Sequence, residues 1–284
     1  VGRAQRARLR RGDRARGGGA VSAPSGRPRT LVWFSCGAAS AVAAKLAVET
    51  YGERCEVVTC DTISTEHPDN RRFFDDVQRW IGRDIRVIRS EKFASIDEVF
   101  ERTHYMAGPA GARCTVEMKK LPRVEYQHPD DTHVFGYTAD ETKRAESFER
   151  HNPSLNVEWL LIDRGISKAD CLAHLSRSGI ALPVMYALGF DHNNCLGCVK
   201  AQSPGYWNRT RRLFPDVFAR RAAVSRLLGA KLALVKGERV YLDVLPPDAD
   251  APDDDIDCGP VCQTPAWSDG DPRNLQLSIF ARFT

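Results

Sequence analysis

The sequence lacks any uninterrupted apolar run close to the roughly 18 residues that a membrane-spanning helix requires. It also lacks an apolar segment of the secretory type after the arginines near its start, and it contains no internal repeat. Export, membrane insertion and a solenoid fold are therefore not expected. We expect a cytoplasmic protein with no membrane partner.

The chain has little net charge outside residues 1–29. The formal net charge is +4 over 284 residues, and without residues 1–29 the chain is close to neutral or slightly acidic. Residues 1–29 are rich in arginine and glycine, a composition typical of a disordered tail. Contact with nucleic acid and a transit peptide are the alternatives that this composition leaves open.

Cysteine, by contrast, is abundant. The chain has nine cysteines, and without a secretory signal these favour reduced thiols over a disulfide framework. Reduced thiols in such numbers serve as metal ligands or nucleophiles. Hydrophobic residues make up 42% and charged residues 27%, as in a globular protein with a substantial core.

The most informative stretch is residues 31–47, LVWFSCGAASAVAAKLA. An apolar run typical of a buried parallel strand is followed by small residues and then by an alanine-rich segment with high helix propensity. A strand, a tight loop and a helix start make an anion site in α/β folds, because backbone N–H groups converge there. An ordinary turn packed with small residues is the alternative. The candidate phosphate-binding residues are Ser35, Cys36, Gly37, Ala38 and Ser40.

Strands and helices then alternate. Apolar runs predict strands at residues 55–60, 85–88 and 132–135, and an amphipathic helix at 71–82. This alternation predicts a parallel Rossmann-like α/β sheet with helices on both faces. Ligands of such sheets bind beyond the carboxyl ends of the strands. The candidate nucleotide-binding residues at these ends are Asp61, Thr62, Gly136, Lys143 and Arg144.

The second half of the chain is expected to be mostly helical. We predict a further strand at 156–162, helices at 167–177, 205–212 and 215–228, and a hairpin from 232–235 and 240–242. Residues 106–111 are predicted to be a loop. The predicted organisation is a tail at 1–29, a nucleotide-binding α/β domain at 30–190, a helical cysteine-containing part at 191–263, and a tail at 264–284.

A CxxC motif, Cys195-Leu196-Gly197-Cys198, allows two thiolates to reach one metal or cluster. Alone it fits zinc, an iron–sulfur cluster, a redox pair or coincidence. Cys114, Cys258 and Cys262 are candidate further ligands. A structural zinc site made by Cys195, Cys198, Cys258 and Cys262 is the main alternative to a cluster.

Several stretches together resemble the sulfonucleotide (PAPS and APS) reductase family of the PP-loop superfamily. Residues 35–40 resemble the SGGxDS loop, residues 61–68 the DTGxxFPET stretch, and residues 136–144 the GxRxxxSxxR segment. Cys114 with Cys195 and Cys198 is similar to the CC…CxxC pattern that ligates a 4Fe–4S cluster. Residues 257–259 resemble the start of the C-terminal ECGxH, which implies that Cys258 is the nucleophile.

Three departures from the family pattern matter. Thr115 replaces the second cysteine of the CC pair, so three obvious cluster ligands remain unless Cys258 or Cys262 joins them. Ala39 stands where ATP-cleaving relatives carry Asp, which favours PAPS or APS over ATP. Cys262 replaces the final histidine of ECGxH and adds a candidate ligand or resolving thiol.

The resemblance implies an enzyme that reduces PAPS or APS with an iron–sulfur cluster and a thioredoxin-like thiol donor. The first alternative is an ATP-dependent, iron–sulfur-dependent thiolation enzyme acting on tRNA or DNA bases. The second alternative is a non-enzymatic nucleic-acid-binding protein that contains zinc. Whether the chain forms a homodimer is left open.

Overall fold

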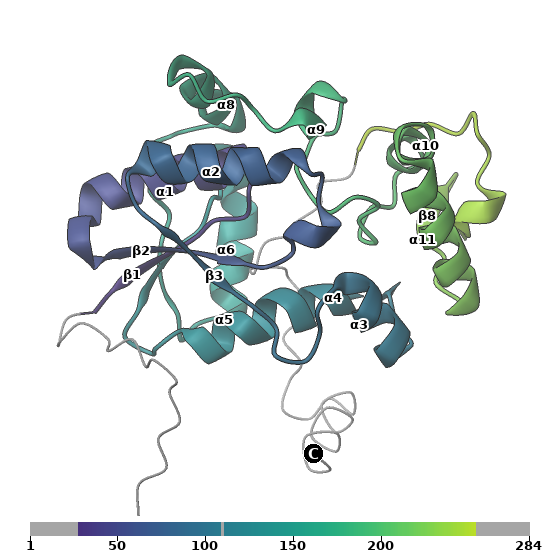
Figure 1. Cartoon of the computed structure of the whole chain (residues 1–284), viewed down its shortest axis with the longest axis horizontal. Helices are drawn as coiled ribbons and strands as arrows, with labels where there is room; N and C mark the ends of the chain where they lie inside the picture. Colours follow the sequence, from purple (N-terminus) through teal and green to yellow (C-terminus); the bar gives the residue numbers. More distant parts are fainter. Residues whose placement is uncertain (1–27, 109–110, 254–284) are drawn as a thin grey trace, which may run out of the picture.

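A five-stranded parallel sheet forms the centre of the protein, seen in a computed structural model that describes residues 28–108 and 111–253 (Figure 1). The strand order is β3-β2-β1-β6-β7, with β1 in the middle. The three inner strands β2, β1 and β6 are mostly buried, whereas the edge strands β3 and β7 are partly exposed. Their bounds are β1 Thr30–Trp33, β2 Cys55–Cys60, β3 Ile85–Ile88, β6 Thr132–Val134 and β7 Asn156–Glu158.

One face of the sheet is covered by helices α1, α2, α7 and α8, which pack on Val32, Phe34 and Val134. Helix α1 is rich in alanine on its buried side, so its backbone lies close to the sheet. Helix α2 ends at Gly82, which adopts a left-handed conformation with φ of 68° and donates its N–H to the Gln78 carbonyl. The bounds are α1 Ala38–Tyr51, α2 Asp69–Ile81, α7 Leu160–Asp163 and α8 Lys168–Arg177.

The other face is covered by α5 (Leu121–Tyr126) and α6 (Thr142–His151). Its core contains aromatic residues, with Trp33 and Phe135 packed on either side of the buried His133 ring. The Nδ1 atom of His133 accepts a hydrogen bond from Trp33 Nε1 at 3.0 Å. Burial is the main reason why the pKa of His133 is lowered to about 4, so this imidazole is neutral at pH 7.

A separate hydrophobic cluster is formed by two parts of the chain, residues 93–118 before β6 and residues 185–245 after β7. Its core contains Phe100, Met106, Trp207 and Leu232, and it includes the CxxC cysteines. Tyr206 and Trp207 are buried core residues, as their sequence context indicates. The elements that form or adjoin this cluster are α3 Ile96–Thr103, β4 Ala107–Gly108, β5 Gly111–Ala112, α4 Arg113–Thr115, η3 Val116–Lys120, α9 Val184–Ala187, α10 Pro204–Leu213, α11 Pro215–Leu227, β8 Ala233–Val235, β9 Glu238–Val240 and η5 Leu242–Val244.

Two sequence predictions are corrected by the structure. The strand predicted at 156–162 ends at Glu158, and residues 160–163 form helix α7 instead, because Leu160 and Leu161 pack in the core beside α1. The loop predicted at 106–111 contains the short antiparallel pair β4–β5. Across residues 28–108 and 111–253, no helix combines the length and the apolar character that crossing a membrane requires.

Candidate functional site

The strand order creates a topological switch point between β1 and β6. The chain adds β2 and β3 on one side of β1, and later adds β6 and β7 on the other. At such a point the connections leave the sheet in opposite directions and open a crevice at the carboxyl ends of the strands. The loops that flank it are residues 35–40 and 136–144, both predicted from the sequence as nucleotide-binding segments.

Gly136 allows these two loops to meet. A Cβ atom at this position would lie 2.7 Å from both the N and the Cα atoms of Ser40, and 3.1 Å from the carbonyl carbon of Ala39. These are backbone atoms, which cannot rotate away as a side chain would. Glycine is therefore required for the end of β6 to lie against the start of α1.

The loop after β1 is organised by its own hydroxyl groups. Ser40 Oγ donates to the Gly37 carbonyl at 3.0 Å and accepts the Ser35 N–H at 3.1 Å. Cys36 adopts a left-handed conformation with φ of 56°, which is uncommon for a residue with a side chain. The loop is thus held in a strained, defined shape at the start of α1, where helix N–H groups lack intrahelical partners.

Two groups from other segments complete this loop. The hydroxyl of Tyr186, on α9, accepts the Ala38 N–H at 3.3 Å. The Cys36 thiol is buried, and burial together with the nearby Glu66 carboxylate raises its pKa well above the ordinary value. This environment favours the protonated thiol at Cys36.

A chain of polar contacts connects this loop to the stretch after β2. Asn193 donates to the Cys36 carbonyl at 2.6 Å and to Asn70 Oδ1 at 2.9 Å. Asn70 donates in turn to Glu66 at 2.7 Å, and Glu66 also accepts from the Thr62 hydroxyl at 2.7 Å. Thr62 therefore lies in the network that supports the loop.

Asp61, the first residue after β2, has a different partner. Its carboxylate accepts from Arg89 Nε at 2.7 Å, and its N–H donates to the Ile88 carbonyl at the end of β3. Asp61 lies at the predicted edge of the sheet, on the side of β2 that faces β3.

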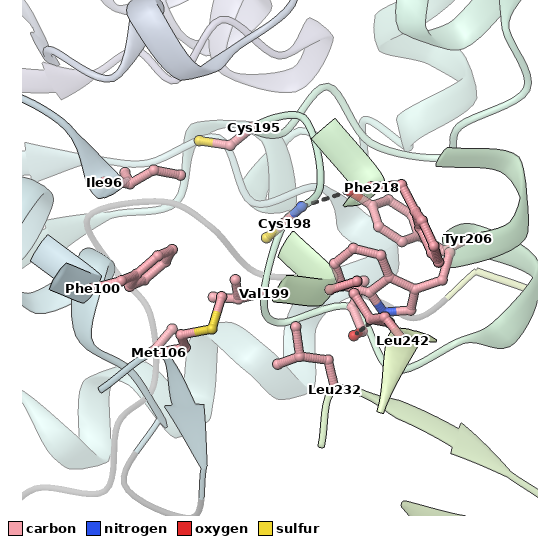
Figure 2. Close-up of a cluster of buried hydrophobic side chains, with 14 of the residues drawn as sticks. Ile96, Phe100, Met106, Cys195, Cys198, Val199, Tyr206, Phe218, Leu232 and Leu242 are labelled. Carbon is pink, nitrogen blue, oxygen red and sulfur yellow. Dashed lines mark hydrogen bonds between the residues drawn. The ribbon is translucent and has the colours of Figure 1, made fainter. Parts of the chain in front are cut away.

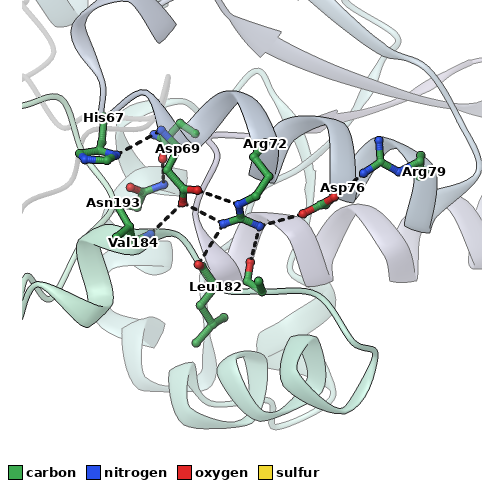
Figure 3. A network of polar contacts seen from close by, with 10 residues as sticks. His67, Asp69, Arg72, Asp76, Arg79, Leu182, Val184 and Asn193 are labelled. Atoms are coloured by element: carbon green, nitrogen blue, oxygen red, sulfur yellow. Dashed lines mark hydrogen bonds and ion pairs between the residues drawn. The ribbon is translucent and has the colours of Figure 1, made fainter.

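The segment that carries Tyr186 is fixed to α2 by an arginine (Figure 3). Arg72 binds Asp69 and Asp76 and also donates to the carbonyls of Ala181 and Leu182. Asp69 accepts the Val184 N–H at 2.9 Å, and its pKa is lowered chiefly by the Arg72 hydrogen bond. The ion-pair network therefore determines where α9 lies relative to the loop after β1.

The segment after β6 begins with a capped turn. The Thr138 N–H donates to Glu141 at 3.0 Å, and residues 139–141 form the short 3-10 helix η4. Arg144 forms an ion pair with Glu141 and stacks over the Tyr137 ring at 5.2 Å, whereas Lys143 is exposed. The predicted cations are therefore close in sequence but differ in environment.

Lys119 is a further cation that the structure places near the site. It lies in the π-helical turn η3 and is 8% exposed. Burial raises the pKa of both Cys36 and Cys60, and the Lys119 charge partly opposes that rise. Turns of π type often occur at functional positions. The sequence analysis did not identify Lys119 as a site residue, because nothing in the sequence marks the π turn.

The CxxC turn is held by contacts on each of its four residues. Leu196 N–H donates to the Thr65 carbonyl at 2.9 Å, and Thr65 Oγ1 lies 3.2 Å from Cys195 Sγ. Cys198 N–H donates to the Tyr206 hydroxyl at 2.8 Å, and Gly197 has a left-handed φ of 62°. Figure 2 shows both cysteines among apolar side chains of the same cluster.

The described residues include three of the candidate metal-ligating cysteines, which lie in or against one hydrophobic cluster. Cys195 and Cys198 are buried in one cluster, and the half-buried Cys114 packs against it. Within residues 28–108 and 111–253, no three Cys, His, Asp or Glu side chains are grouped closely enough to hold a metal ion. Cys258 and Cys262, the other predicted functional cysteines, lie outside the described residues. The described residues therefore bring Cys195, Cys198 and Cys114 into one part of the fold without forming a complete metal site.

Comparison with known proteins adds no relative. The chain matches no protein-family model, and no curated protein matches its sequence.

Proposed function

We propose that this chain is a sulfonucleotide reductase-like enzyme that performs sulfur chemistry on an adenine nucleotide, most simply PAPS or APS. One observation carries the proposal: Thr65, on the stretch that follows β2 at the switch-point edge, contacts both Leu196 N and Cys195 Sγ. This contact supports the proposal because it joins the stretch after β2, which carries Asp61 and Thr62, to the cysteine pair. A reaction between a nucleotide's sulfate and a thiol needs this proximity.

In this proposal the loop from Ser35 to Ser40 binds phosphate through its backbone N–H groups. Small side chains at Gly37 and Ala38 allow the anion to approach the start of α1. Lys143 and Arg144 pair with phosphate or sulfate oxygens, and Asp61 accepts from a ribose hydroxyl. Binding requires Arg144 to exchange part of its contact with Glu141 for the anion.

Cys258 is the proposed nucleophile. Its thiolate attacks the sulfate sulfur, the bond from sulfur to the bridging oxygen breaks, and the nucleotide leaves with that oxygen. The product on the enzyme is a thiosulfonate. A thioredoxin-like thiol then attacks Cys258 Sγ, releases sulfite and supplies the two electrons as a disulfide forms.

A 4Fe–4S cluster is the proposed cofactor, with Cys195, Cys198, Cys114 and Cys262 as candidate ligands. When bound, such a cluster would supply a fixed local charge beside the sulfate. Its iron atoms would also stabilise the cysteine thiolates, which could then remain deprotonated although they are buried. The contacts on the CxxC turn support this because they hold the Cys195 thiol and the Cys198 backbone in place before any metal binds. Zinc at the same ligand pair is the alternative.

The first experiment is anaerobic purification with counts of iron, sulfide and zinc, followed by titration with PAPS, APS and ATP. We expect a brown protein with about four irons that binds PAPS or APS. Cys258→Ser should abolish a covalent sulfite adduct and leave nucleotide binding intact. A colourless protein with one zinc and no nucleotide affinity would instead support a non-enzymatic zinc protein that binds nucleic acid.

A second candidate function is ATP-dependent thiolation of tRNA or DNA bases. The observation that favours it is Thr115, which replaces a cluster cysteine and is only 1% exposed inside the fold. With three cysteine ligands, one iron would stay open for sulfur delivery. Release of AMP and pyrophosphate from ATP in the presence of nucleic acid would distinguish this function from sulfonucleotide reduction.

A further inference from the structure

Arg221, on α11, is one of the largest fully buried side chains of the described chain, with 2% exposure. Its guanidinium forms an ion pair with Asp97 on α3 and stacks over the Phe100 ring at 5.4 Å. A buried arginine is expensive unless it is paired, so this position is specified by its surroundings.

The third partner of Arg221 is the CxxC turn itself. Arg221 Nε donates to the Gly197 carbonyl at 3.2 Å, in the peptide group that joins Gly197 to Cys198. A Cβ at Gly197 would lie 2.9 Å from Val217 Cγ1 and 3.1 Å from Arg221 Cγ, so the turn lies directly on α11. Arg221 thus connects the turn between the two thiols to α3 and α11.

The geometry points to Arg221 as the positioning residue of the Cys195–Cys198 pair, which fixes the turn for metal binding and holds a buried positive charge on the peptide group between the two cysteines. This inference rests on the proposed function, because it assumes that these thiols bind a metal or cluster. Groups that hydrogen-bond the ligand-bearing backbone orient the ligands and tune the metal. Arg221 can do both, because one side chain hydrogen-bonds the Gly197 carbonyl and also carries the positive charge.

The ion pair with Asp97 stabilises the Arg221 charge inside the core. Asp97 lies at the start of α3, where a carboxylate is favoured, and it is about one-third exposed, so it neutralises Arg221 from the solvent side. The other edge of the guanidinium, at Nε, remains directed to the turn. A lysine would keep the charge but has no planar fork with which to contact Gly197 and Asp97 together.

The test is titration of the reduced, metal-free full chain with cobalt(II), followed through the thiolate-to-cobalt charge-transfer absorption. For Arg221→Met we expect the dissociation constant to rise about 10- to 100-fold. We also expect the absorption band to move to longer wavelength, because loss of the cation raises the energy of the thiolate electrons. A purely structural role would not move this band.

Arg220→Met is the matched control. Arg220 is the neighbouring residue on the same helix and pairs with the same Asp97 at 3.6 Å, but its side chain is 55% exposed. We expect its dissociation constant to stay within about twofold of the wild-type value, as for most surface ion pairs. Circular dichroism and thermal unfolding establish that each variant is folded.

The outcomes separate the two proposals. A folded Arg221→Met protein with wild-type affinity and band position overturns the role of Arg221 while the metal site stands. A wild-type chain without a thiolate–cobalt band overturns the metal site and the role of Arg221 with it. If Arg221→Met does not fold, Arg221→Lys decides: we expect weaker binding with the band unshifted, and unchanged affinity overturns the inference.

Discussion

Replacing Gly136 with alanine tests whether the contact between the ends of β1 and β6 builds the nucleotide loop. The new methyl carbon would lie 2.7 Å from Ser40 N and Cα, about 0.7 Å short of ordinary van der Waals contact. Neither backbone segment can move easily, because Ser40 is in the first turn of α1 and Gly136 follows the buried Phe135, the residue after β6. The strain must move the loop after β1.

The expected magnitude follows from this geometry. Overpacking by one methyl group typically lowers the free energy of unfolding by about 1–3 kcal/mol, and backbone obstacles place Gly136→Ala near the upper end. For a domain of this size that corresponds to a fall in melting temperature of roughly 5–10 °C. Displacement of the loop N–H groups should also weaken nucleotide binding by about tenfold or more, equal to about 1.4 kcal/mol.

The assays are thermal unfolding and calorimetric titration with PAPS or APS, with Gly179→Ala as the control. Gly179 follows α8, has φ of 71° and has open space around its Cβ position. Alanine there should cost about 1 kcal/mol through backbone strain alone and leave nucleotide affinity unchanged. Wild-type affinity in a folded Gly136→Ala protein would refute the assignment of this loop contact to nucleotide binding.

Two further predictions concern the CxxC turn and the buried histidine. Thr65→Val removes the hydroxyl that lies between Thr62 and Cys195, so we expect about tenfold weaker cobalt(II) binding and a loss of about 1 kcal/mol in urea denaturation. Unchanged cobalt affinity would contradict a role for Thr65 in connecting the stretch after β2 to the cysteine pair. Burial lowers the pKa of His133 to about 4, so as the pH falls the unfolded chain takes up this proton first. The free energy of unfolding should therefore fall by about 2 kcal/mol more in wild type than in His133→Phe between pH 7 and pH 5, and equal pH slopes would argue against a neutral buried imidazole.

Most of the central sheet was predictable because β1, β2, β3 and β6 coincide with short runs rich in apolar residues that are followed by polar or small residues. β2 and β3 have the predicted bounds, and β1 and β6 differ from them by one residue. From the parallel alternation alone, the loops at 35–40, 61–66 and 136–144 are expected at one edge. The strand order adds that two of these loops flank the switch point.

The error at residues 160–162 has a physical origin. Trp159, Leu160, Leu161 and Ile162 form an apolar run of four, and a run this short does not distinguish a buried strand from a buried helical turn. Asp163 N–H bonds to the Trp159 carbonyl, and Leu160 and Leu161 are buried in the core next to α1. Tertiary packing selected the helix.

The supporting residues of the site could not be read from the sequence because their partners are distant along the chain. Asn193 reaches the Cys36 carbonyl and Asn70, and Tyr186 reaches Ala38, across more than one hundred residues in each case. Amide and phenol side chains have no spacing pattern that indicates such pairing. The one weak signal was position, since Asn193 lies two residues before Cys195.

These long-range contacts also bear on how the two halves of the chain depend on each other. The predicted boundary at residue 190 separates a nucleotide part from a cysteine part, yet Asn193 and Leu196 lie beyond it and bond to Cys36 and Thr65 before it. Asn193 is 6% exposed, so its loss would leave the Cys36 carbonyl without this buried donor. The conformation of the anion loop is therefore determined partly by the segment that carries the CxxC turn. The proposed reaction between a nucleotide and a thiol requires the two segments to lie close together, and these bonds between them are consistent with that requirement.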